Sequence, residues 1–379
     1  MTTSAVGAPG VDGLVVEERL SVASQRQLIW WRFRKHRLAI FSGIVILLFY
    51  LSALGANFLA TADPEYSDAL LNLMPPQRVY LFDDGQWFPH VCALTGQRDL
   101  MTYKKVYKPD CNIKVPLRFF VAGYPYKFLG LIRTDIHLLG VGGDFQTNKT
   151  LFLLGTDIQG RDLWSRLVLG TRVSLSIGLV GVGLSLILGI ILGGFSGYYG
   201  GYIDTVIQRV IEILRALPTI PLWMGLAAAL PRHWSVLQVY FAITLIIALF
   251  AWTDLARVVR GRFLALREED FVSAARLAGA RPWRIIMAHM LPSFYSHIIA
   301  AVTLAIPAMI VSETSLSFLG LGLRPPAISW GTLLQSAQNI QSVATTPWLL
   351  IPAIPVIVAI LAFNFLGDGL RDAADPYSN

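Results

Sequence analysis

The sequence predicts an all-α polytopic membrane protein that carries a small extracytoplasmic insert of short strands and loops. Hydrophobic residues make up 54% of the 379 positions, charged residues only 15%, and the mean hydropathy is +0.56. Such a composition is typical of a chain that lies in a bilayer. Windows of about 20 apolar residues, the length needed to cross roughly 30 Å of hydrocarbon, are predicted at 38–60, 173–197, 205–230, 236–259, 292–318 and 346–369.

The third window is the least regular of the six. Arg209, Glu212 and Arg215 fall in its first half, and Pro218 and Pro221 interrupt its middle. A broken helix with charges is tolerated at membrane depth where it faces other helices or a water-filled cavity. We therefore count 205–230 as a crossing, which gives six.

The basic residues predict the orientation of the crossings. Lys and Arg cluster in the leader 1–37 and in the loop after the fourth crossing, so both segments are expected in the cytoplasm. An even number of crossings then places the carboxyl end there as well, and the first crossing is interpreted as an uncleaved signal anchor. Because topology explains the net charge of +7, no nucleic-acid partner is expected.

Residues 61–165 contain no spanning window and predict an extracytoplasmic insert. The runs 78–82 and 117–121 are rich in β-forming residues, and clusters of Gly, Pro and Asp separate them. Both cysteines of the chain, Cys92 and Cys111, lie here on the expected oxidising side, which predicts a disulfide. Two unrelated buried thiols are the alternative. A metal site is not expected, because His90 and His137 match no zinc spacing.

A short helix is predicted at the start of the segment 270–292, in the cytoplasmic loop of about 260–291. Three acidic residues at 268–270 suit the positive end of a helix, and Gly279 suits its carboxyl cap. Phe271, Ala274, Ala275 and Ala278 recur at helical spacing, so they would form one small apolar face that suits a groove on a partner. The alternative is a basic loop that folds back on its own bundle.

Several segments together resemble the permease subunits of binding-protein-dependent ABC importers, in particular the dipeptide and oligopeptide permease group. An entry segment at 154–174 resembles the stretch before the family's membrane core, and 270–292 resembles its cytoplasmic EAA loop. The carboxyl-terminal matches lie at 313–322, 325–326, 329–331 and 363–372. The resemblance covers about 150–379 with the leader and first crossing, and it implies the type I importer permease fold.

The resemblance also implies the partners and the domain plan. This chain would pair with a second homologous permease subunit, two ATP-binding cassette ATPase subunits and an extracytoplasmic substrate-binding protein in a bacterial inner membrane. ATP and Mg would be bound by the ATPases, and this chain would carry no cofactor and no catalytic residue. The expected plan is a leader 1–37, a first helix 38–60, an insert 61–165 and a permease core 166–379.

The EAA loop implies a set of residues that couple to the ATPase. Its members are Asp270, Phe271, Ser273, Ala274, Ala275, Arg276, Ala278, Gly279, Leu291 and Pro292. Ser273 stands where the family motif has a glutamate, so this chain has no carboxylate at that position.

Glu212, Arg215 and Glu313 are candidates for the translocation pathway, because charges at membrane depth usually face an interior. Mutual structural pairing explains them equally well. Enzyme motifs are missing from the sequence, and the main rival is an ATP-independent secondary transporter, which would not need the 270–292 helix. The expected substrates are peptides, with oligosaccharides or opines as the alternative.

Overall fold

The computed structural model describes residues 25–83, 85–98, 100, 105–141 and 151–374. The chain begins with α2 (Gln25–Lys35), α3 (Arg37–Leu54) and α4 (Ala56–Leu59), which lead through η1 (Ala69–Leu71) into a sheet. After the sheet come α5 (Leu163–Tyr199), α6 (Gly201–Ala216), α7 (Thr219–Ala228), α8 (Val236–Leu266), α9 (Asp270–Leu277) and α10 (Pro282–Arg284).

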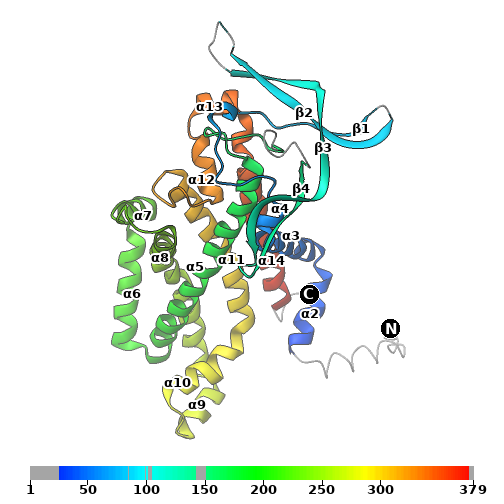
Figure 1. Ribbon diagram of the computed structural model, residues 1–379. Helices are drawn as coiled ribbons and strands as arrows, with labels where there is room; N and C mark the ends of the chain where they lie inside the picture. Colours follow the sequence, from blue (N-terminus) through cyan, green and yellow to red (C-terminus); the bar gives the residue numbers. More distant parts are fainter. Residues whose placement is uncertain (1–24, 84, 99, 101–104, 142–150, 375–379) are drawn as a thin grey trace, which may run out of the picture.

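The second half of the helical part begins with a change of helix type. A π-helical turn η3 (Ile285–Met290) and a 3-10 turn η4 (Leu291–Phe294) lead into α11 (Tyr295–Phe318). Short elements follow on the side of the sheet, namely α12 (Trp330–Leu334), η5 (Gln335–Ala337), α13 (Ile340–Thr345) and η6 (Pro347–Leu350). The last helix, α14 (Ala353–Ala374), returns beside α3 and α11 (Figure 1).

The predicted fold class is confirmed. Within the described residues, five helices are long and apolar enough to cross a membrane, in α3, α5, α8, α11 and the segment Pro347–Ala373. A sixth span results if α6 and α7 count as one, because they bend by 85° at a short break. Pro218 caps α7 at that break, as the prolines in the third window predict.

Helix α5 is longer than its window predicts, since it runs for 37 residues from Leu163. Its first turns carry Trp164, Arg166 and Arg172, which keep them out of an apolar window. Trp164 Nε1 donates to the carbonyl of Leu59 at 2.9 Å, and Arg172 Nε donates to the carbonyl of Ala53 at 3.0 Å. The polar start of α5 therefore fastens α4 and the carboxyl-terminal end of α3 to the bundle.

Glycines bring α5 and α8 into close contact. A Cβ atom on Gly193 would lie 2.5 Å from the carbonyl oxygen of Ala256, and one on Gly197 would lie 2.8 Å from that of Arg260. Neither position has room for a side chain, so the two backbones touch directly. This contact forms one wall of the helical core.

The insert is a four-stranded antiparallel sheet in the order β1-β2-β3-β4, built from β1 (Val79–Asp83), β2 (Gln86–Arg98), β3 (Lys105–Phe128) and β4 (Ile132–Val141). Its strands are longer than the predicted short runs, and β3 has 24 residues. Two of the predicted breaks lie instead at register shifts: Pro109 and Asp110 pair with β2 beside the shift between Cys92 and Ala93, and Gly123 and Pro125 lie within the shift between Ala122 and Tyr126 of β3. Bulges absorb residues that cannot continue a regular ladder.

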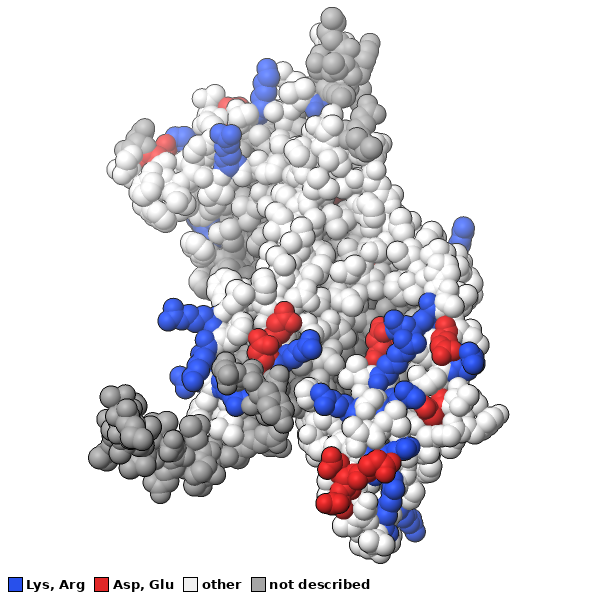
Figure 2. All heavy atoms as spheres, turned by 180° about the vertical axis from the view of Figure 1, so that it is seen from behind, with Lys and Arg blue, Asp and Glu red and all other residues white. Residues whose placement is uncertain are grey.

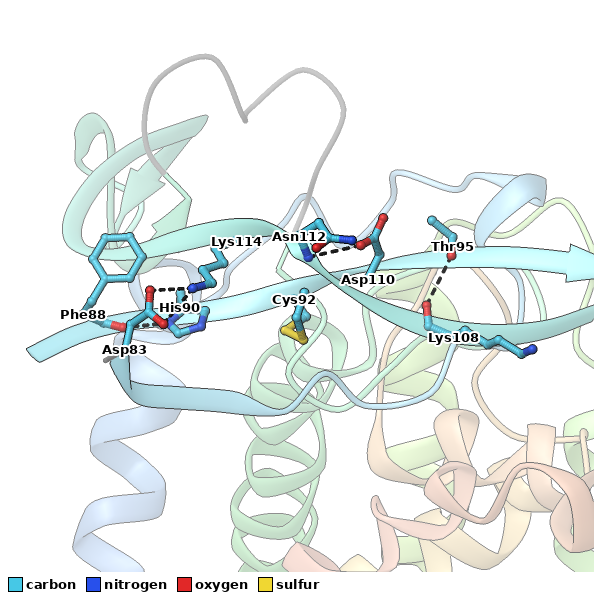
Figure 3. The surroundings of a disulfide bond; sticks show 10 residues. Asp83, Phe88, His90, Cys92, Thr95, Lys108, Asp110, Asn112 and Lys114 are labelled. Atoms are coloured by element: carbon cyan, nitrogen blue, oxygen red, sulfur yellow. Dashed lines mark hydrogen bonds and ion pairs between the residues drawn. A yellow bond between two sulfur atoms is a disulfide. The ribbon is translucent and has the colours of Figure 1, made fainter. Parts of the chain in front are cut away.

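Cys92 and Cys111 form a disulfide between β2 and β3 (Figure 3). It lies at the register shift that follows Cys92. Lys114 Nζ makes an ion pair with Asp83 at 2.6 Å and so ties β1 to β3 near the same place. Closing a loop of about 20 residues stabilises such a sheet by roughly 3 kcal/mol in the chain-entropy model.

A buried hydrogen-bond network joins the insert to α5. The Oγ atom of Ser165 accepts the backbone N–H groups of Thr61 at 2.9 Å and Ala62 at 3.0 Å. Asp162 caps α5 by accepting the N–H of Ser165 at 2.8 Å, and it also accepts the hydroxyl of Thr61 at 3.1 Å. Burial raises the pKa of the Asp162 carboxyl to about 6, although these hydrogen bonds act in the opposite direction.

Charged side chains gather toward the two ends of the molecule. In Figure 2 they lie over the lower end, which carries α9, and around the sheet, while most of the surface between them is uncharged. The uncharged band coincides with the candidate spans. The described ends of the chain meet on one side, since α2 lies beside α14 and His36 Nε2 is 3.9 Å from Asp372 Oδ2.

Candidate functional site

Helix α9 lies at the end of the molecule farthest from the sheet (Figure 1). It begins after Glu269, which caps it without a side-chain hydrogen bond, and Asp270 lies in its first turn. At its other end the N–H of Gly279 donates to the carbonyl of Arg276 and the N–H of Ala280 to that of Ala275, both at 3.0 Å. These two bonds form a Schellman cap, and the φ angle of +77° at Gly279 is the left-handed conformation that it requires.

One side chain anchors α9 to the bundle. Val272 is completely buried, and it belongs to an apolar cluster with residues of α8, η3, η4 and α11. Ala275 is half-buried against the same cluster. The guanidinium of Arg276 lies 5.0 Å from the centre of the Tyr198 ring, which adds a cation–π contact with α5.

The opposite side of α9 faces outward. Phe271 is 41% exposed and Leu277 is 91% exposed, and Ser273, Ala274 and Ala278 are exposed beside them. The predicted apolar face therefore needs one correction. Ala275 turns inward because it follows Val272 by three positions, and Leu277 is an outward apolar residue that the 271, 274, 275, 278 pattern missed.

The remaining predicted coupling residues, Gly279, Leu291 and Pro292, follow α9 in the chain. Leu291 is buried in the same cluster as Val272, while Pro292 is exposed in η4. Gly279 has open space around it, because a Cβ atom there would meet no heavy atom within 4 Å. The loop thus consists of a buried base and an exposed helix, with nothing from the described chain packed on the outer side of Gly279.

The three candidate pathway residues do not lie together. Arg215 of α6 makes an ion pair with Asp254 of α8, and both line a hollow of about 530 Å³ between α5, α6, α7, α8 and α11. Glu212 makes an exposed ion pair with Arg209 at 2.8 Å. Asp254 was missed by the sequence reasoning, although an acidic residue in the fourth apolar window was a visible signal.

Glu313 lies inside the bundle. It is completely buried, and its Oε1 atom accepts the hydroxyls of Ser329 at 2.7 Å and Ser317 at 2.8 Å. Ser174 donates to its Oε2 atom at 3.4 Å and accepts the backbone N–H of Trp330 at 3.0 Å. The carboxyl group thus joins α5, α11 and the start of α12, on the side of the bundle that carries the insert.

The loop before α5 is a second ordered motif. Asp157 accepts the N–H of Arg161 at 3.0 Å and its Nε at 2.7 Å, which closes the turn at 157–161. Gly155 and Gly160 have positive φ angles and pack against the backbone of residues 68–76, where a Cβ atom would collide. This motif fixes the direction in which α5 leaves the insert.

Comparisons with known proteins identify the family. The family model "binding-protein-dependent transport system inner membrane component" matches residues 186–377, just over half of the chain. The chain belongs to this family. A second model, the N-terminal transmembrane domain of oligopeptide transport permease C, matches residues 24–76. The chain is therefore a permease of the dipeptide and oligopeptide permease group, as the motifs predicted, and the comparisons narrow that group to permease C; it is not itself the ATPase.

Individual relatives agree with the family match. The oligopeptide transport system permease protein OppC of Escherichia coli K12 is 39% identical over 244 residues, which are 64% of this chain and 77% of that protein. The dipeptide transport system permease protein DppC of Lactococcus lactis is 41% identical over 229 residues, 60% of this chain and 64% of that protein. A solved structure of the MetNI methionine ABC transporter has 19% identity and a TM-score of 0.44, over 55% of this chain and 96% of that one.

Proposed function

We propose that this chain forms half of the pathway through which an ATP-driven importer carries peptides into a bacterial cell. Its relatives in the oligopeptide and dipeptide permease group support peptides as the substrate class. An extracytoplasmic binding protein would deliver the peptide, and two ATPase subunits would bind the ATP and Mg. Both chain ends and α9 would lie in the cytoplasm, which agrees with the basic residues at each.

The exposed apolar side of α9 carries the proposal. An apolar side chain as exposed as Leu277 is costly to leave in water, and it lies on a helix whose position is fixed from behind by Val272. A helix that is fixed to the bundle and has an apolar outer side can bind in a groove on a partner, and a movement of the partner would then move the helix. Closure of the ATPase dimer would move α9, and the shared apolar cluster would pass that movement to α8 and α11.

A second permease subunit would close the hollow between α5, α6, α7, α8 and α11. The lining of the hollow is mainly apolar, with hydroxyl groups from Ser185, Thr219, Thr253 and Ser312 and the ion pair of Arg215 and Asp254 as its polar groups. A lining that is mainly apolar with a few polar groups is typical of a small-molecule site and is compatible with peptides. The Arg215–Asp254 ion pair would lie at the edge of the pathway, where its opening could accompany passage of the substrate.

A transport assay tests the substrate class. The complex is purified from its native membrane with its binding protein and reconstituted in proteoliposomes that contain ATP. We expect uptake of labelled short peptides that depends on ATP and on the binding protein, with no uptake of labelled oligosaccharides. Uptake of oligosaccharides or opines alone would refute peptides as the substrate class, and uptake without ATP would refute the importer mechanism.

A further inference from the structure

The closed end of the β3–β4 hairpin exposes large apolar side chains that neither the sheet nor the proposed pathway uses. Leu131 is 84% exposed, Ile132 is 65% exposed and Leu129 is 54% exposed. All three lie at the single turn that joins β3 to β4. Gly130 between them adopts a positive φ of 76°. A turn in water normally has polar residues in these positions, so this turn has the composition of a buried or lipid-facing segment.

The β3–β4 hairpin packs against α4, at the outer end of the first span. The rings of Phe120 in β3 and Phe58 in α4 lie 6.2 Å apart, and the Nδ1 atom of His137 in β4 is 2.8 Å from the carbonyl oxygen of Asn57. Figure 1 shows the hairpin passing α4, with its closed end at the level of the helical bundle. The apolar closed end lies further along the hairpin than these contacts, and α3, which leads into α4, also has Leu51 and Leu54 more than half exposed.

Two cations flank the apolar turn. Lys127 and Arg133 are directly opposite each other in the β3–β4 register, and both are exposed. Two like charges in a cross-strand pair repel each other in water and destabilise the hairpin. The same pair is favourable beside anionic headgroups, toward which Lys and Arg extend while their stems remain in apolar surroundings.

The backbone of the turn is suited to an apolar environment. The N–H of Gly130 donates to the carbonyl of Lys127 at 3.3 Å, and the N–H of Leu131 donates to that of Phe128 at 3.0 Å. Internal bonds of this kind lower the cost of moving polar backbone groups out of water. The side chains gain roughly 25 cal/mol for each Å² of apolar surface removed from water.

We propose that the β3–β4 turn, residues 127–133, is an anchor that inserts Leu129, Leu131 and Ile132 into the outer leaflet of the membrane and places Lys127 and Arg133 among its anionic headgroups. The anchor holds the insert beside the first span. It acts independently of the transported substrate and of the ATPase contact.

Depth-resolved fluorescence quenching tests the anchor in the assembled complex. Leu131→Cys is compared with Leu100→Cys, a matched control because Leu100 is 87% exposed in the same insert but outside the hairpin. Each cysteine is labelled with an environment-sensitive dye under non-reducing conditions, and peptide mapping verifies that Cys92–Cys111 is intact. The complexes are placed in nanodiscs with anionic lipid and with lipids that carry a nitroxide on the headgroup or on the acyl chain.

The anchor predicts several-fold stronger quenching by nitroxide lipids at position 131 than at position 100, and protection of position 131 from aqueous iodide. Equal iodide access at both positions would overturn the proposal. Protection from iodide without lipid quenching would also overturn it, because a protein would then cover the turn. Charge reversal of Lys127 and Arg133 to Glu should at least halve the lipid quenching at position 131, and an unchanged signal would refute their role with headgroups.

Discussion

Replacement of Leu277 by alanine should weaken binding of the ATPase while leaving the permease itself intact. The side chain is 91% exposed, so the folded chain gains almost nothing from it. Burying a leucine against a partner is worth about 2 kcal/mol, and each 1.4 kcal/mol corresponds to a factor of ten in affinity. We therefore expect the dissociation constant for the ATPase subunits to rise about 30-fold, with no change in the thermal stability of the permease.

The assay is a titration of the solubilised permease complex with labelled ATPase subunits isolated from the same transporter. Leu100→Ala is the control, because it removes an equally exposed leucine from the insert. Val272→Ala is the comparison variant on the buried side of α9. Loss of its two methyl groups should lower the stability of the chain by about 2 kcal/mol and should also weaken binding of the ATPase. Wild-type affinity in Leu277→Ala would refute the docking surface assigned to α9.

Three further perturbations test other parts of the structure. Gly279→Arg places a long side chain at a φ of +77° in open space, so we expect normal membrane insertion with reduced recovery of ATPase; full recovery would count against docking there. Gly193→Val should lower the thermal unfolding temperature, because Gly193 touches the backbone of α8. Gly183→Ala on the same helix should not, because Gly183 has open space around it. Equal effects of the two variants would refute the close contact. The raised pKa of Asp162, about 6, means that the folded state binds its proton more tightly than the unfolded state does, so acidification from pH 7 to 5 should stabilise the junction by about 1 kcal/mol. Higher amide protection factors at Thr61 and Ala62, obtained after division by the pH-dependent intrinsic exchange rates, would report this, and Asp162→Asn should remove the pH dependence of the protection factors.

The sequence predicted the spans well because each is defined by its own apolar residues. It also predicted the break of the third span, since proline restricts its own backbone and that of the preceding residue whatever surrounds them. The apolar window at 173–197 covers only part of α5, which begins ten residues earlier, at Leu163. Its first ten residues are helical because they are capped by Asp162 and packed on α3 and α4, and a hydropathy window does not register either contribution.

The sheet was predicted only in outline. Gly, Pro and Asp residues indicated separate short strands, but pairing with neighbouring strands allows β3 to continue through them at its register shifts. The pairing of long strands is a tertiary property that no local run of residues encodes.

The candidate site was predicted to the level of the helix but not of its faces. Helical spacing alone is compatible with either side of α9 facing the bundle, and the side is decided by the apolar cluster against which Val272 packs. The partners of the charged pathway candidates could not be predicted from sequence spacing. Arg215 was predicted without its partner Asp254. The serines that hydrogen-bond to Glu313 lie up to 139 residues away along the chain.

A site-specific cross-link at position 277 tests whether α9 docks on an ATPase subunit. A photoreactive amino acid replaces Leu277 in the chain in its native membrane, with a second variant that carries it at position 100 as the control. If α9 docks on the ATPase, position 277 cross-links to an ATPase subunit, identified by mass spectrometry, and position 100 does not. Cross-links from position 277 only to this chain, or to a protein that does not bind ATP, would refute docking through α9.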